Sequence, residues 1–292
     1  MIRYGSILQT YWDWRAAGNF IFGGTGSGLM ICAVLLAYPA PLIPGLGLLA
    51  LGFMGLGLFL VWLEIGRPLR FLHVYYHPQT SWMTREGTVA AILFPVALLG
   101  MYLKLPWLAV IAGIFAAMFL YCQARIIKAS KGVPAWREPG VVPLMVSTGL
   151  VEGAAIGMLA LCLVARPSTG FMAAFAVLLL LRAYSWSQYG QGLHRHNAPR
   201  EALAVIDGMA GLTLWGGNIA PLLLTVAAIL LPSLALILVF IAAVAALISG
   251  WHMKYTIIRR ASQLQGYAFG KLRKGRPNIK PPVRRKPDRF VF

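Results

Sequence analysis

Two consecutive stretches decide the fold of this chain: AGNFIFGGTGSGLMICAVLLAY at residues 17–38 and IPGLGLLALGFMGLGLFLVWL at residues 43–63. Neither contains Asp, Glu, Lys or Arg, and each has the roughly 20 residues that an α-helix needs to cross a bilayer. Six further apolar stretches follow, at residues 87–104, 106–124, 141–165, 168–187, 207–230 and 233–253. We therefore predict an all-α integral membrane protein with eight transmembrane helices.

The composition excludes a water-soluble protein. Of the 292 residues, 59% are hydrophobic and 12% are charged, whereas about a quarter of a soluble domain is charged. The three cysteines are widely spaced inside apolar stretches and form no C-x-x-C pair, so we expect no iron–sulfur cluster or zinc site in this chain. The N-terminus lacks a basic leader with a cleavage site, and we expect no removable signal peptide.

The basic residues predict the orientation in the membrane. Of 26 Lys and Arg residues, 12 fall at or after Lys254, and only Lys104 and Arg166 fall on the side opposite the termini. Basic residues gather on the cytoplasmic side of membrane proteins. We therefore predict that both termini lie in the cytoplasm of a bacterial or archaeal cell, with a transmembrane domain at 1–256 and a basic cytoplasmic tail at 257–292. Pro106, Pro167 and Pro232 predict tight turns that make antiparallel hairpins of spans 3–4, 5–6 and 7–8.

The segment between the second and third spans concentrates the polar chemistry. It reads LEIGRPLRFLHVYYH at residues 63–77 and SWMTRE at residues 81–86. Glu64 ends one predicted helix and Glu86 begins the next, so the two carboxyls can converge at one membrane interface. Salt bridges to Arg67 or Arg85 at the helix ends are the structural alternative.

These residues resemble a known family. LEIGRPLRF followed by SWMTRE is similar to the segment that joins spans 2 and 3 in membrane-anchor subunits of dimethyl-sulfoxide-reductase-type oxidoreductases, the DmsC branch of the DmsC/NrfD/PsrC superfamily. Members have eight spans and about this length, so the resemblance covers most of the chain except the basic tail. It implies an electron-transport anchor subunit with two four-helix bundles that binds a quinone, either menaquinone or ubiquinone.

The resemblance also implies partners. A four-cluster ferredoxin-like iron–sulfur subunit would dock on the cytoplasmic face and connect the quinone to a molybdenum- or tungsten-pterin catalytic subunit. Iron–sulfur clusters and the pterin would belong to these partners, and no haem is expected because the histidines lie in polar segments or alone at a helix end. Aromatic acyl-CoA oxidoreductases of the phenylacetyl-CoA:acceptor type are one candidate complex.

Residue roles follow from matching the family's motif. Glu86 matches a glutamate of the family that is implicated in binding quinol or in exchanging its proton. Glu64 stands where related anchors have a histidine. Glu64 or the nearby His73 would therefore be the second proton acceptor. The amide of Asn19 could hold a quinone carbonyl or bridge two helices. The predicted catalytic residues are Glu86, Glu64 and His73; the predicted quinone-binding residues are Asn19, Arg70, Tyr76, Trp82 and Arg85; the predicted partner or lipid contacts are Arg67, Arg259 and Arg260.

Glu152 lies near the middle of the fifth span, where an acid is costly and usually functional or paired. It could support proton movement, form an ion pair with Arg182 on the next helix, or remain a neutral packing group. A different class of function, a secondary transporter, would place its substrate at Glu152 and Arg182 in the membrane midplane.

The glycine-rich stretch at residues 24–28 resembles a nucleotide loop only superficially, because no strand precedes it and no lysine follows it. We interpret it as small-residue packing of the first helix against Gly45, Gly52, Gly55 and Gly57 of the second.

Overall fold

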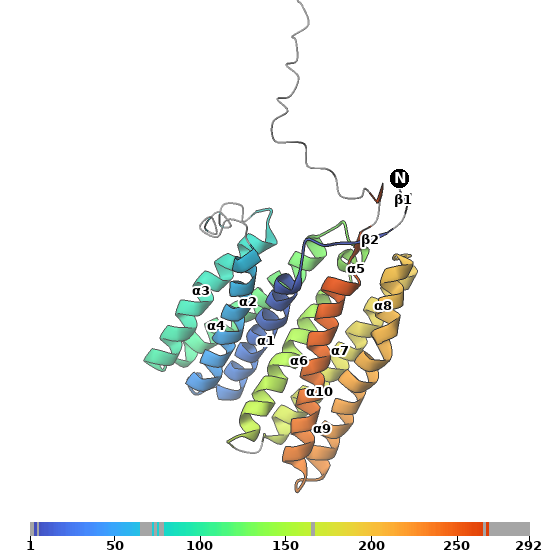
Figure 1. The fold of residues 1–292 in the computed structure, drawn as a ribbon. Helices are drawn as coiled ribbons and strands as arrows, with labels where there is room; N and C mark the ends of the chain where they lie inside the picture. The colour runs from blue at the N-terminus through green and yellow to red at the C-terminus, as the bar shows by residue number, and fades with distance from the viewer. Residues whose placement is uncertain are drawn as a thin grey trace, which may run out of the picture.

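The computed structural model describes residues 3–4, 6–64, 72, 75, 79–164, 167–264 and 267–268, and within them the chain is almost entirely helical (Figure 1). The elements are β1 (Arg3–Tyr4), β2 (Ile7–Leu8), α1 (Trp14–Ala37), α2 (Pro44–Glu64), α3 (Trp82–Leu103), α4 (Pro106–Ala129), α5 (Pro134–Arg137), α6 (Val141–Cys162), α7 (Thr169–Arg195), α8 (Arg200–Gly211), the π-helix η2 (Leu212–Ile219), α9 (Ala220–Leu230), α10 (Ala235–Tyr255), the π-helix η3 (Thr256–Arg260), β3 (Gln263–Leu264) and β4 (Tyr267–Ala268).

The eight predicted spans are confirmed. Within the described residues, eight helices are long and apolar enough to cross a membrane, with α8, η2 and α9 acting as one span and α10 with η3 as another. Their outer surfaces carry large exposed apolar side chains, including Leu35, Tyr102, Leu163, Leu223 and Ile237. Exposed apolar surface of this extent is stable only against lipid.

Several helices begin earlier than the hydropathy predicts, because capping groups mark the helix ends while hydropathy marks only the part in lipid. The side chain of Asp13 caps α1 by accepting from the backbone N–H of Arg15 at 2.7 Å. That of Ser81 caps α3 by accepting from the N–H of Thr84 at 3.3 Å. The cap at Ser81 places Glu86 inside the helix.

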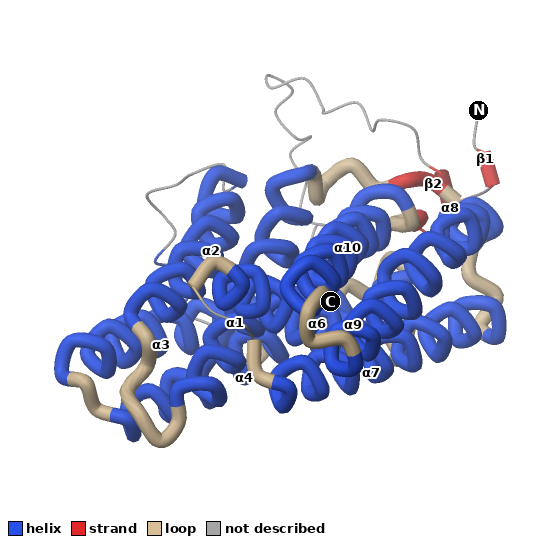
Figure 2. Tube along the Cα trace, turned by 90° about the horizontal axis from the view of Figure 1, so that it is seen from below, coloured by secondary structure: helices blue, strands red, loops and turns tan. Residues whose placement is uncertain are grey.

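The helices form two groups, α1–α4 and α6–α10, joined where α1 packs against α6 (Figures 1 and 2). Glycines allow this approach: a Cβ on Gly28 would overlap the carbonyl oxygen of Gly149, and one on Gly153 would overlap the backbone of Gly28. The predicted glycine contact between α1 and α2 is thus only partly right. Gly57 does pack closely on α1, with its Cβ position 2.9 Å from the backbone nitrogen of Gly23, but Gly45 and Gly52 have no neighbour within 4 Å.

The two ends of the described chain meet on one side of the helical bundle. Strand β1 pairs with β4, and β2 pairs with β3, both antiparallel. The last helix also runs further than the domain boundary that we expected at residue 256, because η3 continues α10 to Arg260 and fully buries Ile257 and Ile258. Residues 257–260 are therefore part of the packed helical domain.

Candidate functional site

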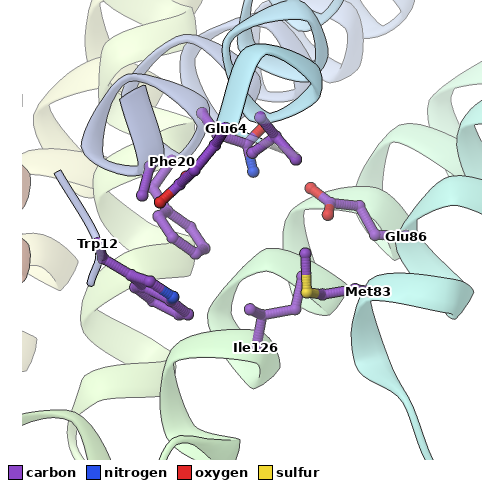
Figure 3. Close-up of a pocket in the computed structure, with 9 residues that line it drawn as sticks. Trp12, Phe20, Glu64, Met83, Glu86 and Ile126 are labelled. Carbon is purple, nitrogen blue, oxygen red and sulfur yellow. The ribbon is translucent and has the colours of Figure 1, made fainter. Parts of the chain in front are cut away.

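A cavity of about 140 Å³ lies at the ends of the first four long helices, on the side where the chain termini meet (Figure 3). It is lined by Trp12, Ala16, Asn19, Phe20, Val61, Glu64, Met83, Glu86 and Ile126. The structure thus brings together three residues that the sequence singled out: Asn19 from α1, Glu64 from the end of α2 and Glu86 from the start of α3.

Glu86 is the most buried acid at this cavity, with 4% of its surface exposed. The side chains of Gln123 and Asn19 lie beside its carboxyl group, and the Gln123 amide donates to the carbonyl oxygen of Asn19 at 3.1 Å. Within the described part of the chain, Glu86 Oε1 and Asn19 Oδ1 have no hydrogen-bond partner. Because buried polar atoms are normally satisfied, two unpaired oxygens beside one cavity indicate a place for a polar ligand.

Glu64 is positioned by contacts at the N-terminal end of α1. The guanidinium of Arg15 donates to the carbonyl oxygen of Leu63 at 2.7 Å and forms an ion pair with Asp13 at 2.8 Å. This hydrogen-bonded ion pair holds the pKa of Asp13 below its ordinary value. Arg15 therefore ties the end of α2 to the start of α1 and keeps the Glu64 carboxyl at the cavity.

The aromatic walls of the cavity differ from those predicted. Trp82 does not line it; its ring lies between the guanidinium groups of Arg85 and Arg125, at 4.2 and 4.4 Å from the ring centre. Arg85 also donates to the carbonyl oxygen of Gln79 at 2.8 Å. Cation–π contacts of this kind hold the Trp82 ring, and other rings line the cavity.

Trp12 and Phe20 supply those rings, and sequence reasoning missed both (Figure 3). Trp12 stacks on Trp136 with 4.6 Å between ring centres, and its carbonyl oxygen accepts from Arg259 at 3.0 Å. Arg259, predicted as a partner or lipid contact, thus holds the cavity wall. The aromatic pair at Trp12 and Trp14 next to a span was the available signal.

The structure gives little information on the remaining predicted residues. Arg67, Arg70, His73 and Tyr76 lie outside the described residues. Arg260 is exposed, with its guanidinium 5.9 Å from the ring centre of Tyr255. Contact of Arg260 with a partner or lipid stays a prediction.

Glu152 does form an ion pair, but not with Arg182 as one alternative proposed. Its partner is Lys254, with 2.6 Å between Glu152 Oε2 and Lys254 Nζ. Lys254 reaches Glu152 because α10 continues to Arg260, which puts the lysine inside the helix rather than at its end. A neutral packing role for Glu152 is not supported by this geometry.

Arg182 is instead bound to protein acceptors. It donates to Asn218 Oδ1 at 2.8 Å, to the carbonyl oxygen of Ala246 at 2.9 Å and to that of Gly217. The π-helix η2 contributes two of these acceptors, Gly217 and Asn218, a common role for π-helical turns at special sites. With three hydrogen bonds to the protein from all three of its nitrogens, Arg182 is poorly suited to bind a transported substrate.

A second cavity, of about 420 Å³, lies at the ends of α4 and α7 and is strongly basic. Lys128, Lys131 and Arg137 line it together with Glu138 and His196, whose side chains are hydrogen-bonded at 2.8 Å. The His194 side chain pairs with Asp207 at 2.9 Å, and the side chains of His194 and His196 are both exposed. Neither histidine is therefore placed as a buried metal or haem ligand.

Comparison with known proteins addresses the same region of the chain. The family model described as polysulphide reductase, NrfD, matches residues 5–105. The predicted family resemblance is confirmed for this N-terminal part of the chain. The matched range contains α1, α2 and α3 and therefore Trp12, Asn19, Glu64 and Glu86 of the cavity. The NrfD-type match implies a membrane subunit of a redox enzyme complex. No curated protein matches the chain.

Proposed function

We propose that this chain is the quinone-reactive membrane subunit of a heteromeric oxidoreductase. The observation that carries the proposal is the cavity among α1–α4, where the buried Glu86 carboxyl, the Glu64 carboxyl and the Asn19 amide surround one space. Its unpaired atoms, Glu86 Oε1 and Asn19 Oδ1, are hydrogen-bond acceptors, which suits the hydroxyl groups of a quinol. The apolar residues of the lining suit its ring.

The chemistry is proton-coupled electron transfer. Oxidation of a quinol releases two electrons and two protons; reduction of a quinone consumes the same number. Glu86 would exchange a proton with one ring oxygen, and Glu64 or His73 with the other, as general acids and bases. Asn19 would hold an oxygen, and Trp12 and Phe20 would contact the ring. Arg70 and Tyr76 stay as proposed quinone contacts, whereas Trp82 and Arg85 would bear on the site through α3.

The electrons would pass to or from an iron–sulfur subunit connected to a molybdenum- or tungsten-pterin catalytic subunit. The end of the bundle that holds the cavity is the expected docking face, because electron transfer requires a cluster close to the quinone. Lys128 and Lys131 at the basic second cavity lie on the same end of the bundle and would meet an acidic partner surface. From the positive charge distribution we place this face in the cytoplasm. Aromatic acyl-CoA oxidoreductases remain our candidate for the complex.

The proposal is tested with Glu86→Gln in the intact complex. The variant keeps the hydrogen-bonding shape but cannot exchange a proton, so quinone-coupled turnover should fall by on the order of 100-fold. Activity with an artificial dye, which bypasses the membrane subunit, should be unchanged. Measuring both activities on the same preparation separates loss of chemistry from loss of assembly. Unchanged quinone turnover in an assembled complex would show that Glu86 is only a buried helix-end acid.

The matched control is Thr88→Val, two residues further along α3. The Thr88 hydroxyl donates to the backbone carbonyl of Thr84 at 2.9 Å, and Thr88 does not line the cavity. Its removal alters a polar group on the same helix without touching the proposed site. Quinone turnover should therefore stay near the unsubstituted level in Thr88→Val.

A further inference from the structure

Three charged side chains are buried together inside the second helical group, and the function proposed above uses none of them. Glu152 on α6, Arg182 on α7 and Lys254 on α10 each have at most 1% of their surface exposed. The side chain of Lys254 also donates to the carbonyl oxygen of Phe20 on α1 at 3.0 Å. Glu152 Oε2 accepts in addition from the hydroxyl of Thr25 at 2.9 Å.

Arg182 completes this cluster from the other side. A Cβ on Gly250 would lie 2.7 Å from Glu152 Oε1 and 3.2 Å from Arg182 Nη1, so the absence of a side chain there lets the acid and the guanidinium approach each other. Glu152 Oε1 has no hydrogen-bond partner among the described residues. The carboxylate therefore faces two cations: it is hydrogen-bonded to Lys254 and lies beside Arg182.

The charges of the cluster do not balance when all three groups are ionised. One carboxylate faces two cations, and a net charge in a low-dielectric interior is costly. A guanidinium does not release its proton in proteins, whereas an ammonium can. Protonation of Glu152 would leave two unbalanced cations. Loss of a proton from Lys254 instead leaves one carboxylate and one guanidinium, which balance.

Lys254 also lies next to the residues that surround Glu86. A Cβ on Gly24 would overlap Lys254 Nζ and would lie 3.7 Å from Gln123 Oε1, and a Cβ on Gly23 would overlap the Gln123 amide. The two side chains thus approach the same bare surface of α1. The Gln123 side chain in turn lies beside the Glu86 carboxyl and donates to the carbonyl oxygen of Asn19, which lines the same cavity. A series of buried polar side chains that are neighbours in space therefore extends from Glu86 through Gln123 to Lys254 and Glu152.

We propose that Lys254 is a buried proton-exchange site for the Glu86 cavity, with Glu152 as its fixed counter-charge and Gln123 as the positioning residue between them. The inference rests on the proposed quinone chemistry. It refines the expectation that Glu152 itself carries the proton. A water hydrogen-bonded to Gln123 would complete the connection, because an amide oxygen accepts a hydrogen bond but does not carry a proton readily.

The steps balance in either direction. In quinone reduction, the iron–sulfur partner supplies two electrons, and Glu86 gives one proton to a ring oxygen while the second proton reaches the other oxygen from Glu64 or His73. The Glu86 carboxylate then takes a proton from Lys254 Nζ, which is left as a neutral amine. After the quinol leaves, one solvent proton returns to Glu64 or His73 and another returns to Lys254 through Glu86. Quinol oxidation reverses each transfer.

The test compares two variants in the intact complex. Lys254→Arg preserves the positive charge beside Glu152 but cannot release its proton. Lys254→Met removes the exchanging amine and leaves Glu152 and Arg182, one carboxylate and one guanidinium whose charges balance. In both, quinone turnover should fall on the order of 100-fold, as for loss of a general acid or base. Dye-linked activity and subunit stoichiometry should be unchanged.

Two further readouts separate proton exchange from a structural role. The pH dependence of kcat with quinone should change in both variants while the KM for quinone does not, because Lys254 does not touch the ring. Thr225→Val is the control, since Thr225 is fully buried on α9 with its hydroxyl donating to the carbonyl oxygen of Pro221, away from the cluster. It should leave kcat and the pH profile unaltered.

The outcomes also distinguish this inference from the function on which it rests. Loss of quinone turnover in Glu86→Gln, with normal kcat and pH profile in an assembled Lys254→Arg or Lys254→Met variant, would overturn the role of Lys254 alone. Normal turnover in Glu86→Gln would overturn the proposed site itself. Should Lys254→Arg fail to assemble because of its larger head group, Lys254→Met decides the question.

Discussion

The cavity near the helix ends and the cluster around Glu152 both contain a buried acid with one unpaired oxygen, but only the acid of the cluster forms an ion pair. At the cavity, Glu86 and Asn19 keep unpaired oxygens beside an open space. In the cluster, Glu152 is held by Lys254 and Thr25 inside packed helices. The difference follows from depth: near the interface a ligand or water can satisfy a polar atom, whereas within the membrane only protein groups can.

The largest expected difference between the two regions is in stability. Glu152→Gln leaves the buried cations Lys254 and Arg182 without a counter-charge, which should destabilise the protein by about 3–5 kcal/mol. Glu86→Gln breaks no ion pair and should have a much smaller effect. Thermal unfolding of the two purified variants in the same detergent measures this. Equal stability of the two would remove the distinction drawn between the regions.

The joint between the two helical groups should be the next most sensitive feature. In Gly28→Ala the added Cβ would overlap the carbonyl oxygen of Gly149 on α6 and force α1 and α6 apart. Overpacking of this kind costs about 1–3 kcal/mol. Gly52→Ala on α2 is the matched control, since nothing lies within 4 Å of its Cβ position. A shift in the unfolding midpoint for Gly28→Ala alone is expected, and similar shifts for both variants would contradict the close contact.

The smallest effect concerns the aromatic wall of the cavity. Trp12→Leu removes the ring that lines the cavity, and the KM for quinone should rise about 10-fold with little change in kcat, as for loss of uniform binding. Trp82→Leu, outside the lining, should leave the KM nearly unchanged. Steady-state kinetics with a soluble quinone compare the two. A larger effect from Trp82 would restore that residue as a wall of the site.

The sequence predicted much of the site because its residues lie at helix ends. Glu64 and Glu86 lie at the two ends of one connection between consecutive spans, so their convergence follows from two spans that meet the same membrane interface. Asn19 could be added because it lies near the start of the first span. Trp12 and Gln123 were missed, because the aromatic N-terminal segment does not by itself indicate a cavity and the sequence does not reveal which side of its helix Gln123 occupies. Trp12 contacts Trp136 of α5, and Gln123 of α4 donates to the carbonyl oxygen of Asn19 on α1, only after these segments pack.

By itself, the sequence determined the eight membrane spans and the approximate place of the cavity, because hydropathy and charge are local properties that act over a single helix. Only the tertiary structure decided which side chains meet across helices. Lys254, rather than Arg182, pairs with Glu152, and Gly28 packs on α6 rather than on α2. Such pairings depend on the rotation and depth of each helix, which the packing of neighbouring helices sets and an apolar sequence pattern leaves open.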